Sequence, residues 1–177
     1  MRPLLTALAL AVSMTASLAH AQPPAVGPYK VLKTVKVGGD GGFDYVYADV
    51  ANRRLYVPRS GPNANVAVFD LDTLASAGLV AGVNGHGAAV DAKSGQGFSS
   101  SKPLAMWDAR TLAPIKAIEV QGNPDGILGD ASSQRIYILS HSAPNVTAIN
   151  AVDGTVIGTV DIGGAPEQAV TDGKGHL

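Results

Sequence analysis

The stretch NPDGILGDASSQRIYILSHSAPNVTAINAVDGTVIGTVDIGG, residues 123–164, contains four short apolar runs separated by turns rich in Asp, Ser, Asn and Gly. Apolar runs bounded by such turn residues predict β-strands. The predicted strands are Asp125–Gly129, Arg135–Ser140, Val146–Asn150 and Thr155–Ile162. Each is about 5–8 residues long, which is a normal length for a strand.

The rest of the chain repeats this unit. An aspartate that closes the first apolar run recurs at intervals of 42, 39 and 42 residues, as Asp49, Asp91, Asp130 and Asp172. Five residues before each of them stands another polar residue: Asp44, His86, Asp125 and Glu167. A period near 42 with four short strands per copy is typical of a β-propeller blade, whereas helical repeats would show a period of 3.6 residues. The sequence therefore predicts an all-β propeller of four-stranded blades.

Three complete blades and the start of a fourth can be placed on residues 30–177. The expected blades are residues 44–84, 86–122, 125–164 and, incompletely, 167–177. A propeller needs about four to eight blades to close, so we expect this sequence to be part of a longer one. A half-propeller that closes by oligomerisation is the alternative. Lys30–Gly39 alternates apolar and basic residues and is predicted to form an additional outer strand.

The first 21 residues have the pattern of a signal peptide. Arg2 precedes an apolar run that ends at Leu18, and Ala19-His20-Ala21 forms a cleavage site. We expect cleavage there, a Pro-rich leader over residues 22–29, and a periplasmic or secreted protein. No membrane span is expected after cleavage, because the apolar run is shorter than the roughly 20 residues that a spanning helix needs.

Composition excludes several classes of function. The chain has no cysteine, which excludes disulfides, thiolate catalysis and attachment of c-type haem. It has 14 acidic and 13 basic side chains, no block of Lys or Arg, and only 5% aromatic residues. This balance argues against a surface that binds nucleic acid by electrostatic attraction.

Four motifs in order resemble one known family. They are GGDGGFDYVYADVANRRLYV (38–57), NGHGAAVDAKSGQGFSSS (84–101), NPDGILGDASSQRIYIL (123–139) and GGAPEQAVTDGKGHL (163–177). The chain resembles the YncE-like, YVTN-repeat β-propellers of the bacterial periplasm and cell surface. The resemblance implies a seven-bladed propeller, of which this chain would be a C-terminally truncated piece, and it says little about function because propellers serve many purposes. Phe43, where Trp is common, and Gln168, where an aromatic residue is common, depart from the pattern.

The strongest candidate site lies where the inner strands begin. Asp44, His86, Asp125 and Glu167 take this first position in four successive blades, so they are predicted to form an arc at one channel mouth. Such groups could hold a divalent cation or grip a polyhydroxylated ligand, although polar side chains at a channel mouth can also be merely solvated. We expect the four residues to share a rim but to stand too far apart to chelate an ion directly. No other cofactor is predicted.

Other polar residues have a structural explanation. The second aspartate set, Asp49, Asp91, Asp130 and Asp172, precedes turns, where the side chain can accept backbone N–H bonds. Asp70, Asp108 and Asn150 have the same interpretation after the third strand of each blade. Trp107 and Phe69 share a repeat position and are expected to pack between blades. His141 and His176 do not share the repeat position of His86, and we expect them to be surface residues.

These observations favour a secreted, non-enzymatic propeller that binds a small ligand or a protein through its channel rim. The first alternative is a metal-dependent, lactonase-like hydrolase with an axial cation that polarises a carbonyl. A second alternative is an electron-transfer or quinoprotein-type subunit, for which the sequence contains no haem or thiol motif. No catalytic residue is assigned, because no pair of nucleophile and base is evident.

Overall fold

A computed structural model describes residues 27–177. The predicted signal peptide, residues 1–21, lies outside the described residues, as does most of the Pro-rich leader. The chain divides into two units, Met1–Thr34 and Val35–Leu177. In the first unit, residues 27–34 are exposed and form no helix or strand. The second unit contains every strand of the described residues. Within the described residues, no helix is both long and apolar enough to cross a membrane.

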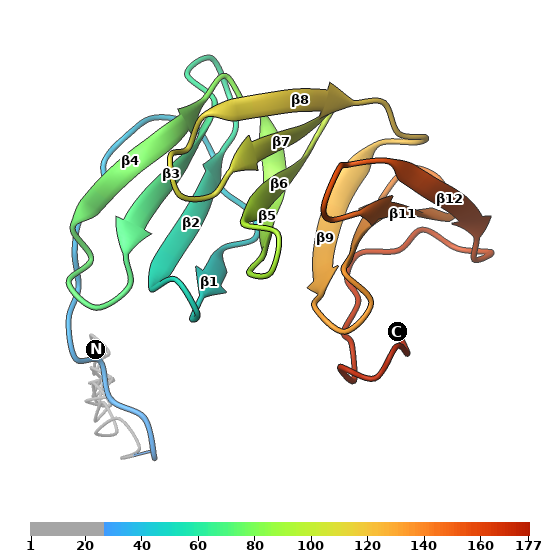
Figure 1. The fold of residues 1–177 in the computed structure, drawn as a ribbon. Coiled ribbons are helices and arrows are strands. Elements are labelled where there is room, and N and C mark those ends of the chain that lie inside the picture. Colours follow the sequence, from blue (N-terminus) through green and yellow to red (C-terminus); the bar gives the residue numbers. More distant parts are fainter. Residues whose placement is uncertain (1–26) are drawn as a thin grey trace, which may run out of the picture. The chain divides into compact units, whose positions relative to one another are not determined.

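Residues 27–177 contain twelve strands, which form three four-stranded antiparallel sheets, and each sheet follows the order of the sequence (Figure 1). The first sheet consists of β1 (Tyr47–Asp49), β2 (Arg54–Arg59), β3 (Asn65–Asp70) and β4 (Ser76–Ala81). The second consists of β5 (Gly85–Asp91), β6 (Gln96–Ser101), β7 (Leu104–Asp108) and β8 (Pro114–Ile118). The third consists of β9 (Pro124–Asp130), β10 (Arg135–Ser140), β11 (Asn145–Asn150) and β12 (Val156–Asp161). The predicted all-β fold of four-stranded blades is confirmed.

The first inner strand is shorter than predicted. It was expected to begin at Asp44, but β1 begins at Tyr47. Ahead of it, the amide of Tyr45 donates to the carbonyl of His86 on β5 over 3.0 Å. The chain therefore leans toward the neighbouring blade before it joins its own sheet, and this contact brings the Asp44 segment close to His86.

Two predicted strands do not form. Lys30–Gly39 is exposed along its length, and Glu167–Asp172 is likewise outside any strand. A strand exists only where a neighbour receives its backbone hydrogen bonds, and no described strand pairs with either segment. The alternation of apolar and basic residues over 30–39 was therefore misleading. Such a pattern shows that a segment could form a strand, but it does not show that a neighbouring strand is available to pair with it.

The three blades share the same turns. The residue four positions after the turn aspartate of each inner strand has a left-handed φ: 53° at Arg53, 72° at Gly95 and 50° at Gln134. After the third strand the same occurs at Leu74, Leu112 and Gly154, whose amides each donate over 2.8 Å to the carbonyl four residues earlier. A left-handed residue is costly unless it is glycine, so its recurrence at fixed positions indicates that turn geometry dominates over residue type.

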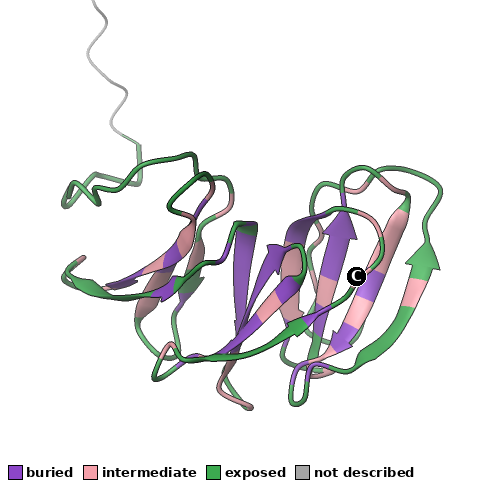
Figure 2. Cartoon of the chain, turned by 90° about the horizontal axis from the view of Figure 1, so that it is seen from above, coloured by how far each residue is buried: buried purple, intermediate pink, exposed green. Residues whose placement is uncertain are grey.

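Apolar side chains fill the seams between blades. Trp107 on β7 is fully buried and packs with Tyr56, Val66 and Val68 of the first sheet. Between the second and third sheets, a second cluster includes Phe98, Met106, Ile136, Ile138 and Ile149. Trp107 therefore packs between blades as predicted, and Phe69 at the equivalent position is also buried. Figure 2 shows buried residues gathered inside the sheets and exposed residues along loops and outer strands.

The inner strands β1, β5 and β9 lie next to one another within the Val35–Leu177 unit (Figure 1). They run in the same direction through successive copies of one repeat. Residues that begin these strands therefore share one end, and the turn aspartates share the opposite end.

Candidate functional site at the channel mouth

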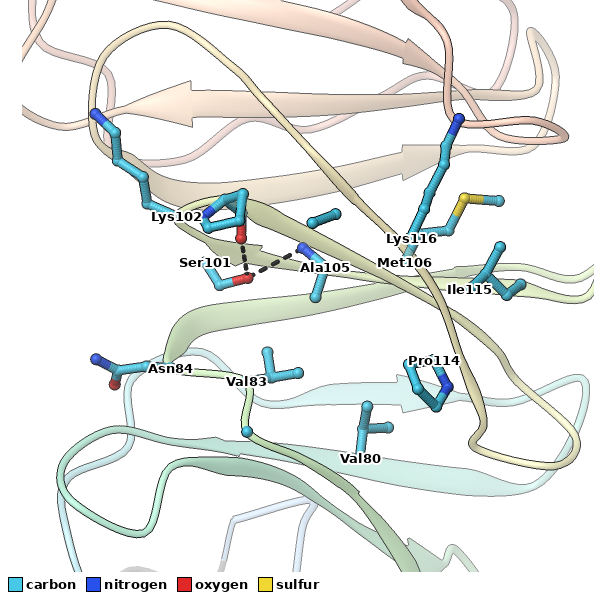
Figure 3. A pocket seen from close by; sticks show the side chains of 13 residues that line it. Val80, Val83, Asn84, Ser101, Lys102, Ala105, Met106, Pro114, Ile115 and Lys116 are labelled. Atoms are coloured by element: carbon cyan, nitrogen blue, oxygen red, sulfur yellow. Dashed lines mark hydrogen bonds between the residues drawn. The ribbon is translucent and has the colours of Figure 1, made fainter.

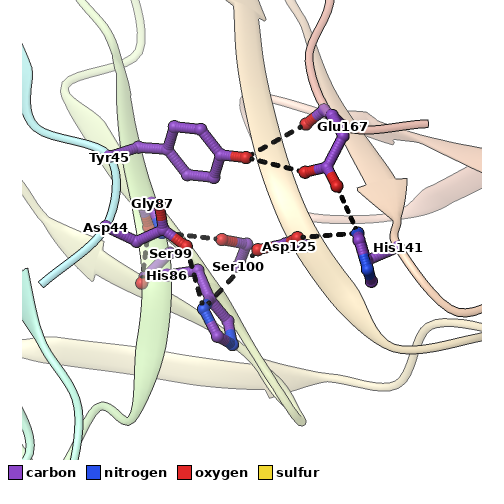
Figure 4. A network of polar contacts seen from close by, with 9 residues as sticks. All are labelled: Asp44, Tyr45, His86, Gly87, Ser99, Ser100, Asp125, His141 and Glu167. Carbon is purple, nitrogen blue, oxygen red and sulfur yellow. Dashed lines mark hydrogen bonds and ion pairs between the residues drawn. The ribbon is translucent and has the colours of Figure 1, made fainter. Parts of the chain in front are cut away.

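The four predicted residues meet at one end of the inner strands (Figure 4). Asp44 stands just ahead of β1, His86 lies on β5, and Asp125 lies on β9. Glu167 comes from the segment that follows β12. Asp44, His86 and Glu167 are exposed, whereas Asp125 is buried with 9% of its surface accessible.

The first half of the site surrounds His86. Its Nδ1 lies 3.4 Å from Oδ2 of Asp44 and 3.5 Å from Oδ1 of Asp125. One ligand atom from each of the three residues lies within 4.8 Å of the other two. A single ring nitrogen thus faces two carboxylates from two different blades.

The second half surrounds His141, which is exposed as predicted but was not assigned to the site from the sequence. Its Nδ1 lies 2.6 Å from Oε1 of Glu167 and 3.5 Å from Oδ2 of Asp125. His141 directly follows β10, and β10 runs antiparallel to β9. A residue just after the second strand therefore returns to the rim where the first strand begins. That topological rule, applied to the predicted strands, would have found it.

The expectation that these groups stand too far apart to chelate an ion is wrong. It considered the spacing of the blades and took no account of how closely the side chains approach one another, and it left out His141. His86 contacts both Asp44 and Asp125, and His141 contacts both Asp125 and Glu167. The result is an alternating row of carboxylates and imidazoles with Asp125 at its centre.

The carboxyl of Asp125 has a raised pKa. Burial raises the pKa of its carboxyl, and the negative charges of Asp44 and Glu167 raise it further against the opposing effect of the two histidines. Its Oδ1 is buried and accepts no hydrogen bond from any described residue. A buried carboxylate oxygen without a donor is costly, and a positively charged ligand would relieve that cost.

Tyr45 extends the row beyond Glu167. Its hydroxyl donates to Oε2 of Glu167 over 3.2 Å. Burial raises the pKa of Tyr45 to about 12, and the charge of Asp125 and the hydrogen bond to Glu167 act in the same direction. The hydroxyl therefore stays protonated at neutral pH and acts as a donor that holds the Glu167 carboxylate in place.

Gly126 allows Glu167 to reach the site. A Cβ at this position would overlap the backbone carbonyl oxygen of Glu167. The segment after β12 can therefore run against β9 only because residue 126 has no side chain. This contact positions Glu167 although its segment belongs to no strand.

A cavity of about 380 Å³ adjoins the row. Asp44 and Tyr45 line it on one side, Gly126 and Ile127 on another, and Gln168 contributes a polar side chain. Gln168 is one of the two departures from the family pattern, whereas Phe43, the other, is 67% exposed and does not line this cavity. The volume suits a small organic ligand.

Carboxylates at the opposite end have a different environment. Asp49 accepts hydrogen bonds from the amide and the side chain of Asn52, and Asp91 accepts one from the amide of Ser94. Asp130 accepts from the amides and hydroxyls of both Ser132 and Ser133. In the final segment Asp172 accepts from the amide of Lys174 and lies 2.8 Å from Nδ1 of His176. Each of these carboxylates is held by its own turn, and Asp130 also accepts from the hydroxyl of Thr171 over 3.3 Å.

The third-strand turns use the same chemistry. Asp70 accepts from the amide and hydroxyl of Thr73, and Asp108 does so from Thr111. Asn150 accepts from the amide of Val152. These contacts stay within one turn and reach no other blade.

A second hollow, of about 430 Å³, lies between the first and second sheets (Figure 3). Its walls are mainly apolar and include Val80, Val83, Met106 and Ile115. The polar residues in its wall are Asn84, Ser101, Lys102 and Lys116. Three of them already have hydrogen-bond partners. The Ser101 hydroxyl donates to the carbonyl of Pro103 and accepts from the amide of Ala105, Lys102 donates to the carbonyl of Gly122, and Asn84 accepts from the amide of Gly61. This hollow therefore has the character of a packing seam, unlike the polar mouth.

No protein-family model matches the chain, and no curated protein matches it significantly. Solved structures of propeller type are similar to it. Hydrazine synthase of Kuenenia stuttgartiensis matches with a TM-score of 0.65 and 18% identity, over 79% of this chain and 41% of that one. U3-55K matches with a TM-score of 0.58 and 11% identity, over 70% and 40%. The RRP9 WD40 repeats match with a TM-score of 0.59 and 12% identity, over 70% and 39%. This chain thus spans about two fifths of each, and the similarity establishes the fold alone.

Proposed function

We propose that this protein is an exported, YncE-like β-propeller that binds a divalent cation at its channel mouth and uses it to hold an oxygen-rich ligand. The four sequence motifs and the signal-peptide pattern support the family and the export. The ligand is a small molecule, or an exposed carboxylate of a protein partner, because both present the same chemistry to the ion. The WD40 repeats among the structural neighbours favour a binding role.

One observation carries the proposal: the buried Oδ1 of Asp125, without a hydrogen-bond donor, faces Nδ1 of His86 beside Asp44. Zinc bound through oxygen and nitrogen at about 2.1 Å with tetrahedral angles separates its ligand atoms by about 3.4 Å. The separations of His86 Nδ1 from the two carboxylate oxygens are 3.4 and 3.5 Å. An ion could therefore enter with little movement of these side chains.

The donor set favours a borderline metal. Imidazole together with carboxylate suits Zn²⁺ and similar transition ions, whereas Ca²⁺ and Mg²⁺ prefer oxygen ligands and higher coordination numbers. Three protein ligands leave a fourth position open in a tetrahedral site. Asp44 lines both the site and the adjoining cavity, so a ligand in the cavity could complete the coordination.

A metal-dependent hydrolase is the second candidate, because three protein ligands and one open position are also the layout of catalytic zinc. Hydrolysis would need a free base beside the bound water. Glu167 is a candidate, but it already contacts His141 and accepts from Tyr45. The binding role is therefore preferred, and a lactone-hydrolysis assay of the Zn²⁺-loaded protein separates the two.

Calorimetric titration of the chelator-treated protein with Zn²⁺, Mg²⁺ and Ca²⁺ tests the proposal. We expect Zn²⁺ to bind most tightly and His86→Ala to weaken it more than about 100-fold, since changes to outer-sphere groups alone cost roughly 10–100-fold. His176→Ala is the matched control, because His176 pairs with Asp172 away from the mouth. Absence of Zn²⁺ binding, or equal loss in both variants, would rule out the proposed site.

N-terminal sequencing of the exported protein tests the cleavage after Ala21.

A further inference from the structure

The row of side chains at the mouth contains two triads of potential ligands. One is Asp44, His86 and Asp125, and the other is Asp125, His141 and Glu167. Asp125 is their common member, and its two oxygens face different histidines: Oδ1 lies 3.5 Å from His86 and Oδ2 lies 3.5 Å from His141. Figure 4 shows this carboxylate between the two rings.

We infer that the mouth binds two divalent cations, with Asp125 bridging them, and that the pair takes an anionic carboxylate or phosphate ligand. This inference rests on the proposed function, which needs only the first cation. A carboxylate with one oxygen toward each ion is a common bridge, and paired ions in such sites lie about 3.5–4 Å apart. Asp125 is suited to the role because it is 9% exposed and its Oδ1 lacks a donor.

Charge supports the second ion. With neutral imidazoles, the carboxylates of Asp44, Asp125 and Glu167 give the mouth a formal charge of −3. One divalent ion leaves it at −1, whereas two ions bring it to +1. A mouth with one ion would repel an anion, and a mouth with two would attract it. The second ion therefore determines the class of ligand that the adjoining cavity accepts.

The two positions differ in readiness. In the first triad, the contacts of His86 with its two carboxylates already match the spacing of ligands around a tetrahedral ion. In the second, His141 and Glu167 are in direct contact at 2.6 Å, so they must separate by about 0.8 Å to admit an ion at the spacing that tetrahedral zinc requires. Tyr45 also holds the other oxygen of Glu167. The second ion should bind more weakly than the first.

The test is a Zn²⁺ titration of the purified protein and of two variants, His86→Ala and His141→Ala, with His176→Ala as control. We expect two ions per chain in the wild type and in the control, and one in each variant. His141→Ala should keep the tighter of the two binding steps. Asp125→Asn should weaken both steps. Thermal unfolding of each variant without metal checks that it is folded.

Three results would overturn parts of the argument in different ways. One Zn²⁺ per wild-type chain, unaffected by His141→Ala, would refute the second ion and leave the first site intact. No Zn²⁺ at all would refute both. If the protein binds two ions, it can be loaded with Mn²⁺ and studied by electron paramagnetic resonance. A spectrum of isolated Mn²⁺ ions would place the second ion elsewhere. Spin coupling between the two Mn²⁺ ions, together with inorganic phosphate binding that needs both ions, would support the inference.

Discussion

Asp125 and Asp130 stand five residues apart on the same strand, β9, and behave in opposite ways. At the channel mouth, burial raises the pKa of Asp125, and its Oδ1 has no donor among the described residues. At the turn end, the hydroxyls and amides of Ser132 and Ser133 lower the pKa of Asp130 to about 2. Both carboxylates are buried. What separates them is the number of donors that the local chain supplies.

The difference shows how a repeat can carry structure at one end of its strands and function at the other. A carboxylate satisfied by its own turn is committed to the fold, because any ligand would have to displace those hydrogen bonds. A carboxylate that contacts only other titratable groups has no such hydrogen bonds to lose and can bind a ligand.

The largest effect is expected from removing the charge of Asp125. Asp125→Asn should weaken Zn²⁺ binding by more than about 100-fold, since it removes a shared ligand. It should not lower the midpoint of thermal unfolding in the absence of metal, because the change removes a buried charge that lacks a hydrogen-bond donor. Asp130→Asn is the matched control and should leave Zn²⁺ affinity unchanged. Equal loss in the two variants would erase the distinction between the ends.

Gly126 offers a way to disturb half of the mouth. Gly126→Ala should push back the Glu167 carbonyl and weaken only the second Zn²⁺ step, by roughly 10–100-fold as for other positioning groups of metal sites. Gly129→Ala on the same strand is the control, because a Cβ there would make only ordinary contacts, at 3.5 Å or more, with Ile136 and Ala89. Calorimetry of both variants measures the effect. Loss of the first step in Gly126→Ala would contradict the assignment.

At the turn end the effect should appear in stability and depend on acid. The pKa of Asp130 is lowered from 3.8 to about 2 in the folded protein, so its stabilising contribution is complete above 3.8 and disappears as the pH falls toward 2. Asp130→Asn should therefore lower the thermal midpoint at pH 7 by several degrees. The midpoints of the two proteins should converge between pH 4 and 2. A constant difference across that range would show that the carboxylate charge is irrelevant.

The smallest effect concerns the left-handed residues of the same turns. Gln134 has a φ of 50° where the second blade has Gly95 at 72°. Gln134→Gly should stabilise the protein by about 0.5 kcal/mol, because glycine relieves the strain but loses more entropy on folding. Gly95→Ala should destabilise it by about 1 kcal/mol, because alanine is strained in a left-handed conformation. No steric clash adds to this cost, since a Cβ at residue 95 would meet no atom within 4 Å. Denaturant unfolding resolves both changes.

The sequence predicted the parts of this molecule that repeat. Fixed spacing of Asp49, Asp91 and Asp130 was sufficient to identify the blades, because turns of one kind need one residue at one place. Within the third sheet every predicted strand end lies within one residue of the observed end. The same logic placed Asp44, His86 and Asp125 at one end of the inner strands.

What the sequence could not predict depends on contacts between segments. Lys30–Gly39 has the pattern of a strand but pairs with no described strand, and strand pairing cannot be read from a single segment. His141 was missed because it has no counterpart at its repeat position, where the other blades have Ser60 and Lys102. The distances within the mouth depend on how far side chains extend from one blade toward the next. Packing determines this, together with the close approach of the Glu167 backbone to Gly126.

The backbone hydrogen bond from Tyr45 to His86 links the mouth to the separation of the first two blades. This bond crosses from the first blade to the second, and it lies directly beside Asp44 and at the carbonyl of His86 itself. Its amide can exchange its proton with solvent only when the two blades separate at this end. Anything that draws the Asp44 carboxylate toward the His86 ring also resists that separation. Occupancy of the site and the opening rate of the seam are therefore coupled, and the Tyr45 amide is a reporter of both.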